Sequence, residues 1–150
     1  MILNNAENES GSGIHLSVNG TSQALVANNV LKDNLTFNIY LGGNGNIYLK
    51  NNDLGSLGGP NNPLENVGNI NLPPRFESGL FNFFPSAISP LVNAGVKPCS
   101  ICPFPVPFDE SWGLGATDLM GYVRNQNGGV DIGAIESIHV PDLIFWGIFE

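Results

Sequence analysis

The amino-acid sequence predicts an all-β fold, a parallel β-helix followed by an irregular terminal cap. The first observation is composition: the 150 residues include 21 Asn, 19 Gly and 11 Pro, but only 12% are charged. Turn-forming residues in this abundance disfavour helices. The second is a series of short alternating segments, and the third is an Asn-Asn pair that recurs at nearly constant spacing. At 42% hydrophobic, the chain has enough apolar residues for one globular domain.

Four short segments alternate apolar and polar residues in the manner of strands. They cover residues 13–17, 23–27, 37–41 and 46–50, and none shows a helical period. Turns rich in Gly and Asn, at residues 18–21 and 42–45, separate the members of each pair. The sequence therefore predicts two short strands in each repeat.

Three Asn-Asn pairs mark the repeat. They begin at Asn4, Asn28 and Asn51, which gives spacings of 24 and 23 residues. One coil of a β-helix has this length, and a recurring amide at its corner can form a side-chain ladder that satisfies the bent backbone. An antiparallel sandwich with Asn-Gly hairpins would give similar strand spacing. The regular amide pairs favour the β-helix.

The composition changes at residues 58–63, where Gly, Pro and Asn replace the alternating pattern. We therefore predict β-helix rungs over residues 1–58, a closing region over 59–137 and a tail over 138–150. Open ends of such a fold need a cover, and an irregular segment rich in Pro and aromatic residues can supply it. The aromatic residues expected to form this plug are Phe81, Phe83, Phe84, Phe104, Phe108 and Trp112.

Three motifs in the closing region carry a resemblance. They are SPLVNAG at 89–95, ATDLMGYVR at 116–124 and GGVDIGAIE at 128–136. In this order they resemble the SP-x-x-x-AG, TD-x-x-G-x-x-R and VDIGA-x-E signature that closes bacterial choice-of-anchor Q proteins. The resemblance covers about residues 70–137.

The resemblance implies a right-handed parallel β-helix of the pectin-lyase-like kind in a secreted or cell-surface bacterial protein. It also implies that the chain is the carboxy-terminal part of a longer β-helix, whose upstream rungs are its first partner. A polysaccharide or cell-surface glycan is the external partner expected. The tail, residues 138–150, departs from known anchor patterns and is interpreted as a final strand, a disordered end or a sorting tag.

The residues that match the motifs are interpreted as structural. Arg124 would pair with nearby carboxylates to hold the closing loop, and Gly121 and Gly133 would permit its turns. The alternative is a functional cluster, in which the three acids bind Ca²⁺ or Arg124 binds a uronate carboxylate. The motif residues are Ser89, Pro90, Gly95, Asp118, Gly121, Arg124, Asp131, Gly133 and Glu136, and the Ca²⁺ alternative would use Asp118, Asp131 and Glu136.

A catalytic site on a β-helix would place charges in register on adjacent rungs. The repeat aligns Asp53 with Val30 and Lys50 with Ala27, so no charged column forms. We expect no catalytic residues and no cofactor in this chain. The alternative is a segment that completes the fold of a polysaccharide lyase or hydrolase with its active site on upstream rungs.

Other residue types suggest binding rather than catalysis. Tyr40, Tyr48 and Trp146 could stack on sugar rings, or could belong to the core. Cys99 and Cys102 lie in a proline-rich loop and could form a disulfide. A structural zinc site needs two more ligands, and neither His15 nor His139 lies at the spacing of a zinc finger from these cysteines. The net charge of −8 argues against nucleic acid as a partner, and no apolar run is long enough to span a membrane.

Overall fold

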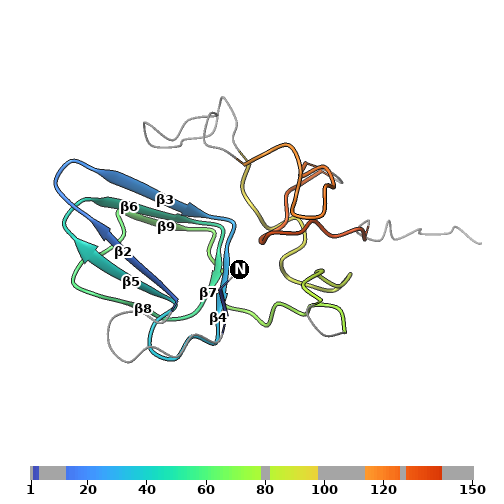
Figure 1. Cartoon of the computed structure of the whole chain (residues 1–150), viewed down its shortest axis with the longest axis horizontal. Coiled ribbons are helices and arrows are strands. Elements are labelled where there is room, and N and C mark those ends of the chain that lie inside the picture. Colours follow the sequence, from blue (N-terminus) through green and yellow to red (C-terminus); the bar gives the residue numbers. More distant parts are fainter. Residues whose placement is uncertain (1, 4–12, 79–81, 98–113, 126–127, 140–150) are drawn as a thin grey trace, which may run out of the picture.

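The computed structural model describes residues 2–3, 13–78, 82–97, 114–125 and 128–139 (Figure 1). These residues form an all-β structure, and none of them is helical. Accordingly, the described part of the chain has no helix that could cross a membrane. The strands are β1 (Ile2–Leu3), β2 (Ile14–Val18), β3 (Gln23–Ala27), β4 (Val30–Lys32), β5 (Ile39–Gly43), β6 (Asn46–Lys50), β7 (Asp53–Leu54), β8 (Leu57–Gly58) and β9 (Glu65–Val67).

Every third strand joins the same sheet. Sheet A contains β1, β4 and β7, sheet B contains β2, β5 and β8, and sheet C contains β3, β6 and β9. All pairs are parallel; Ile14 faces Ile39, for example, and Gln23 faces Asn46. Strands that stack in this way are the rungs of a parallel β-helix, which confirms the predicted fold class and excludes the antiparallel sandwich (Figure 1).

Apolar side chains fill the space between the three sheets. Alternate residues of each strand point inward, because side chains along a strand alternate between its faces. This core consists of Val18, Leu31, Ile39, Leu41, Ile47, Leu49 and Leu54, each at most 6% exposed. Every sheet therefore contributes to one continuous core, and burying it is the main term that stabilises the rungs.

The second Asn of each pair forms a ladder at the corner between sheets C and A. Asn52 Oδ1 accepts a hydrogen bond from the backbone N–H of Asn29 at 2.9 Å. Asn69 Oδ1 accepts in the same way from Asn52 at 2.8 Å. The Asn52 Nδ2 group also donates to Val26 O and to Asn69 Oδ1. This is the amide ladder that the repeat predicts, although its first pair, Asn4-Asn5, lies outside the described residues.

The first residue of each corner pair has a left-handed backbone. The φ angles are 59° at Asn28, 50° at Asn51 and 68° at Gly68. Asn tolerates this conformation better than most residues, and Gly adopts it freely. The third corner therefore uses Gly68-Asn69 in place of an Asn-Asn pair, a substitution that a search for amide pairs alone overlooks.

Rung pairing continues beyond residue 58. β9 (Glu65–Val67) pairs with β6, and Ile70 forms a parallel bridge with Asp53. The ladder spacing shortens from 23 residues between Asn29 and Asn52 to 17 between Asn52 and Asn69. The third turn thus lies partly within the region that the change in composition assigns to the closing segment.

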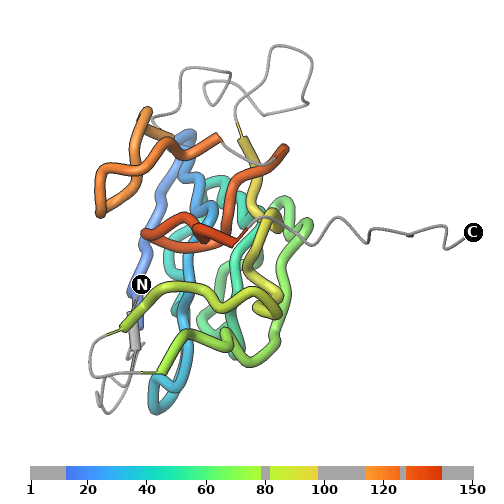
Figure 2. The backbone as a smooth tube through the Cα atoms, turned by 90° about the vertical axis from the view of Figure 1, so that its right-hand side faces the viewer, coloured from blue at the N-terminus to red at the C-terminus, as the bar shows by residue number. Residues whose placement is uncertain are grey.

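We call the described residues that follow Ile70 the irregular region. This region packs against sheet A, on the face turned away from the rung core (Figures 1 and 2). Val30 is outside that core and forms a second buried cluster with Leu91 and Ile132. Phe83, one of the residues expected to plug an open end, contacts Phe76 edge-on at 6.0 Å beside this cluster. It therefore covers a lateral face. Phe84 is partly buried nearby, and the remaining residues of the expected plug, Phe81, Phe104, Phe108 and Trp112, lie outside the described residues.

The left-handed Asn residues dock the irregular region onto the rungs. Asn28 Nδ2 donates to Val96 O at 2.7 Å, and Val96 N donates to Asn28 Oδ1 at 2.8 Å. Asn51 Nδ2 donates to Ala94 O at 2.9 Å. The backbone N–H of Gly133 adds a bond to Asn28 O. In the two described Asn-Asn pairs, the first Asn holds the irregular region and the second belongs to the ladder between neighbouring rungs.

Candidate functional site

The four charged residues of the closing motifs gather in one place. Arg124 Nη1 lies 3.1 Å from Glu136 Oε1 and also donates to Gly133 O at 2.9 Å. The backbone N–H of Glu136 donates to Asp118 Oδ2, and that of Asp131 donates to Glu136 Oε2. We call this set, Asp118, Arg124, Asp131 and Glu136, the closing-loop network. It joins two segments, residues 114–125 and 128–139.

Each carboxylate oxygen of the closing-loop network accepts a hydrogen bond from the chain itself. Asp118 Oδ1 accepts from the backbone N–H groups of Met120 and Tyr122, at 2.8 Å each. Asp131 Oδ1 accepts from Asn93 N at 2.7 Å, and Asp131 Oδ2 accepts from Ser137 N at 2.6 Å. Charge-assisted bonds of this kind are stronger than those between neutral groups. The acids therefore hold the backbone of the loop.

Glu136 is the most deeply placed acid of the closing-loop network, with 1% of its surface exposed. Burial raises the pKa of Glu136 to about 7, and the charge of Asp131 adds to the increase, whereas Asp131 N–H and Arg124 oppose it. The desolvation cost of the buried carboxylate outweighs its stabilising contacts. Arg124 Nε is buried without a hydrogen-bond partner among the described residues.

The remaining motif residues shape the backbone around the closing-loop network. Gly121 and Gly133 have φ angles of 89° and 129°, which other residues rarely adopt. A Cβ atom on Gly95 would lie 2.7 Å from Val130 O, so only glycine allows this approach. Ser89 is 7% exposed and donates through Oγ to Pro74 O, and Pro90 follows it at the start of the turn.

Charged residues on the rungs form pairs that column alignment misses. Asp53 aligns with Val30 and Lys50 with Ala27, as the repeat predicts. However, Lys32 Nζ lies 2.8 Å from Asp53 Oδ1, although these residues are offset by two positions on adjacent rungs. Diagonal neighbours on one face of a sheet are within reach of long side chains. A search that included offsets of two could have found this pair.

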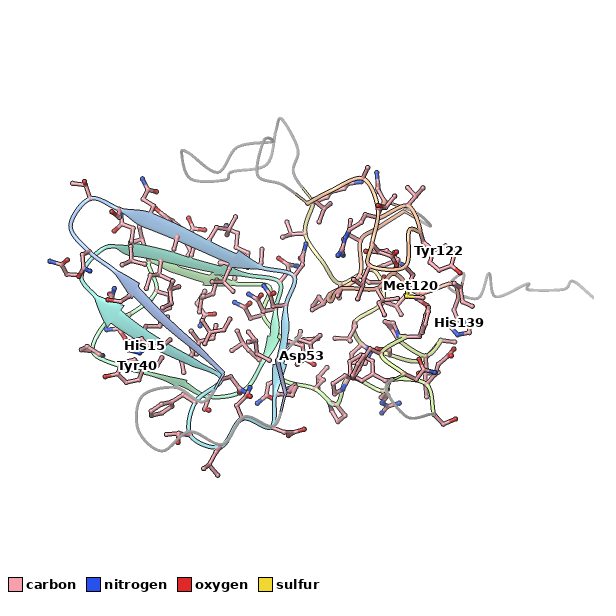
Figure 3. All side chains as sticks on the ribbon, viewed as in Figure 1. His15, Tyr40, Asp53, Met120, Tyr122 and His139 are labelled. Atoms are coloured by element: carbon pink, nitrogen blue, oxygen red, sulfur yellow. The ribbon has the colours of Figure 1, made fainter. Side chains whose placement is uncertain are left out.

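The outer face of sheet B carries an aromatic group. The rings of His15 and Tyr40 meet edge-on with centroids 4.9 Å apart (Figure 3). The ring centroid of Phe37 lies 6.0 Å from that of Tyr40. Tyr40 is partly exposed, whereas Tyr48 on sheet C is only 5% exposed. Of the two described residues that were expected to stack on sugars, Tyr40 is therefore the more exposed to solvent. Trp146 lies outside the described residues.

A polar pocket of about 390 Å³ opens at the corner that joins β4 to β5. Lys32 and Asn71 form part of its wall, and Lys32 Nζ donates to Asn71 Oδ1. Asn38 also lines it and is held in place, because its Oδ1 accepts from Gly55 N and Ser56 N at 2.8 and 2.9 Å. The other wall consists of Leu72, Pro73 and Pro74.

An apolar cavity of about 200 Å³ lies between sheet A and the irregular region, where Val30, Phe83 and Ile132 line it. Next to it, the turn at residues 119–123 exposes apolar side chains, and Leu119, which also lines the cavity, is 74% exposed. Figure 3 shows Met120 and Tyr122 of this turn in the irregular region, away from the rungs.

The described residues contain no group of three His, Cys, Asp or Glu side chains arranged to hold a metal ion. Asp118, Asp131 and Glu136 are close together, but their oxygens already bind the N–H groups described above. Cys99 and Cys102 lie outside the described residues. At the start of the tail, His139 Nε2 lies 2.8 Å from Glu77 Oε1, and this hydrogen bond holds the pKa of Glu77 below its usual value.

No family model, curated protein sequence or solved structure matches this chain.

Proposed function

We propose that this chain is the non-catalytic closing part of a secreted or cell-surface β-helix protein of the choice-of-anchor Q kind, with an outer surface that contacts glycans. The observation that carries the proposal is the closing-loop network. Asp118, Asp131 and Glu136 bind backbone N–H groups of their own loop, so the acids of the resembled motifs have a structural task. A general acid or base needs a carboxyl group within reach of a substrate, whereas these carboxyl oxygens already accept hydrogen bonds from the chain itself.

The contacts between the rungs and the irregular region support the same proposal. Asn28 and Asn51 bind the backbone of residues 94–96, and Val30 packs against Leu91 and Ile132. These contacts cover the outer face of sheet A and shield it from water. A region built in this way stabilises neighbouring rungs, which individually bury too little surface to be stable alone.

Partly exposed Tyr40 supports the glycan contact. Its ring lies on the outer face of sheet B, beside His15 and Phe37. An aromatic ring can pack against the apolar face of a sugar while its polar edge remains hydrated. The negative charge of the chain, −8, favours neutral glycans over acidic ones as binding partners.

Two measurements on the purified chain test this proposal. Incubation with pectate, alginate and neutral plant and bacterial polysaccharides should release neither unsaturated products nor new reducing ends. Affinity electrophoresis through gels that contain the same neutral polysaccharides should retard the chain, and Tyr40→Ala should reduce the retardation. Turnover that Asp131→Asn abolishes would contradict the non-catalytic role, and unretarded migration in every gel would contradict the glycan contact.

A further inference from the structure

We propose that the polar pocket at the β4–β5 corner binds a single uncharged sugar residue of a glycan. This inference rests on the glycan contact proposed above and assigns it a specific site. The pocket has one polar wall, formed by Lys32, Asn38 and Asn71, and one apolar wall that includes Leu72 and Pro73. Two walls of opposite character suit a pyranose ring, which carries hydroxyl groups at its rim and C–H groups on its faces.

The polar wall is rigid before any ligand arrives. Lys32 Nζ is held between Asp53 Oδ1 at 2.8 Å and Asn71 Oδ1. Asp53 Oδ1 also accepts from the backbone N–H of Leu72 at 3.1 Å, which ties the two walls together. Asn38 is fixed through its Oδ1 atom by two backbone donors. Groups that are already ordered lose little conformational entropy when a ligand binds.

Two buried polar atoms at this corner have no hydrogen-bond partner among the described residues. They are Asn38 Nδ2, a donor, and Asp53 Oδ2, an acceptor. Asn38 is 4% exposed and lines the pocket, and Asp53 is fully buried beside the lining residues Lys32 and Leu72. An unsatisfied buried polar group costs free energy that a partner would recover. Of the two residues, only Asn38 lines the pocket, and a sugar hydroxyl can accept from its unpartnered Nδ2 group.

The charge of the pocket selects against acidic sugars. Lys32 and Asp53 neutralise each other, and the exposed Asp33 adds a negative charge to the rim. A uronate carboxylate would be repelled by Asp33 and would find Lys32 already engaged. The volume of about 390 Å³ lies within the range of small-molecule sites. An uncharged hexose or N-acetylhexosamine therefore fits the pocket best.

NMR titration of the full ¹⁵N-labelled chain tests this inference. The probes are the methyl glycosides of glucose, galactose, mannose and N-acetylglucosamine, and the charged comparison is the methyl glycoside of galacturonate with its carboxylate free. At least one neutral probe should cause saturable shifts in the side-chain amides of Asn38 and Asn71 and in the backbone amides of Gly55 and Ser56. Galacturonate should bind at least about tenfold more weakly.

Asn71→Ala should weaken the neutral probe at least about fivefold, because the exposed Asn71 side chain lines the pocket and contacts Lys32. The matched control is Asn62→Ala, which removes an exposed Asn outside the pocket and should leave the affinity unchanged. Both variants should retain the dispersed spectrum of the folded chain.

The pocket assignment is overturned if Asn71→Ala binds as tightly as the control or if galacturonate binds as well as the neutral probes. Shifts confined to His15 and Tyr40 would also overturn it but would leave the glycan contact standing. If the pocket does not respond while the gels still retard the chain, the site lies elsewhere on the surface; if neither assay detects binding, both proposals fail.

Discussion

The amide ladder can be tested by removing its central member. Asn52 is fully buried, and Asn52→Ala would remove the side-chain partner of two backbone groups, the N–H of Asn29 and the carbonyl oxygen of Val26. Oδ1 of Asn69 would keep its bond from the backbone N–H of residue 52. Each buried group that loses its partner costs about 1–3 kcal/mol, so the free energy of unfolding should fall by about 2–6 kcal/mol. This is a large fraction of the roughly 5–15 kcal/mol that stabilises a typical domain.

Urea denaturation followed by far-ultraviolet circular dichroism measures this loss. The control is Asn62→Ala, which removes an exposed side chain of the same type and should change the free energy of unfolding by less than about 0.5 kcal/mol. If Asn52→Ala lies within about 1 kcal/mol of this control, the ladder is not a stabilising element and the reasoning is refuted.

Three further predictions concern the irregular region. Because the pKa of Glu136 is raised to about 7 from 4.5, its contribution to stability should fall by about 3 kcal/mol as the pH rises through this interval. Urea midpoints at about pH 4 and about pH 8 should therefore differ less in Glu136→Gln than in the wild type, and equal differences would contradict the assignment. Arg124→Met leaves the buried Glu136 carboxylate without its cation, so the free energy of unfolding measured in urea at about pH 8 should fall by about 2–4 kcal/mol. An unchanged free energy of unfolding would argue against the ion pair. Asn28→Gly preserves the left-handed backbone but removes two hydrogen bonds to Val96. Hydrogen exchange at the Val96 amide should therefore accelerate at least about tenfold, while exchange at the rung amides should not change. Equal acceleration at all amides would show that the whole fold is destabilised and would contradict a local role.

The sequence predicts two of the three strands in each turn, those of sheets B and C, because their signals are local, but it does not predict the short strands of sheet A. Strand alternation and the spacing from Asn28 to Asn51 both follow from the period of one coil. The alignment of Asp53 with Val30 follows from the same spacing and is found in the structure. The third turn was harder to predict, because its ladder residue Asn69 follows Gly68 and its spacing falls to 17 residues. A fixed period cannot anticipate a shortened coil.

The irregular region and the pocket depend on contacts between distant residues. The bonds between Asn28 and Val96 span 68 positions, and no periodic pattern in the sequence specifies them. The pocket combines Lys32 with Asn71, which are 39 positions apart. The proximity of Arg124 and Glu136 was expected from the motifs, but the backbone bonds to each carboxylate follow from loop geometry that Gly133 permits.

The shortening of the third turn makes the two edges of the β-helix unequal. At the first turn, β2 and β3 each present a five-residue strand at the margin of its sheet, whereas at the third turn β8 has two residues and β9 has three. A long regular edge is a template for another strand, and a short one is a poor template. A further strand would therefore pair more readily with the edges of β2 and β3 than with the short edges of β8 and β9.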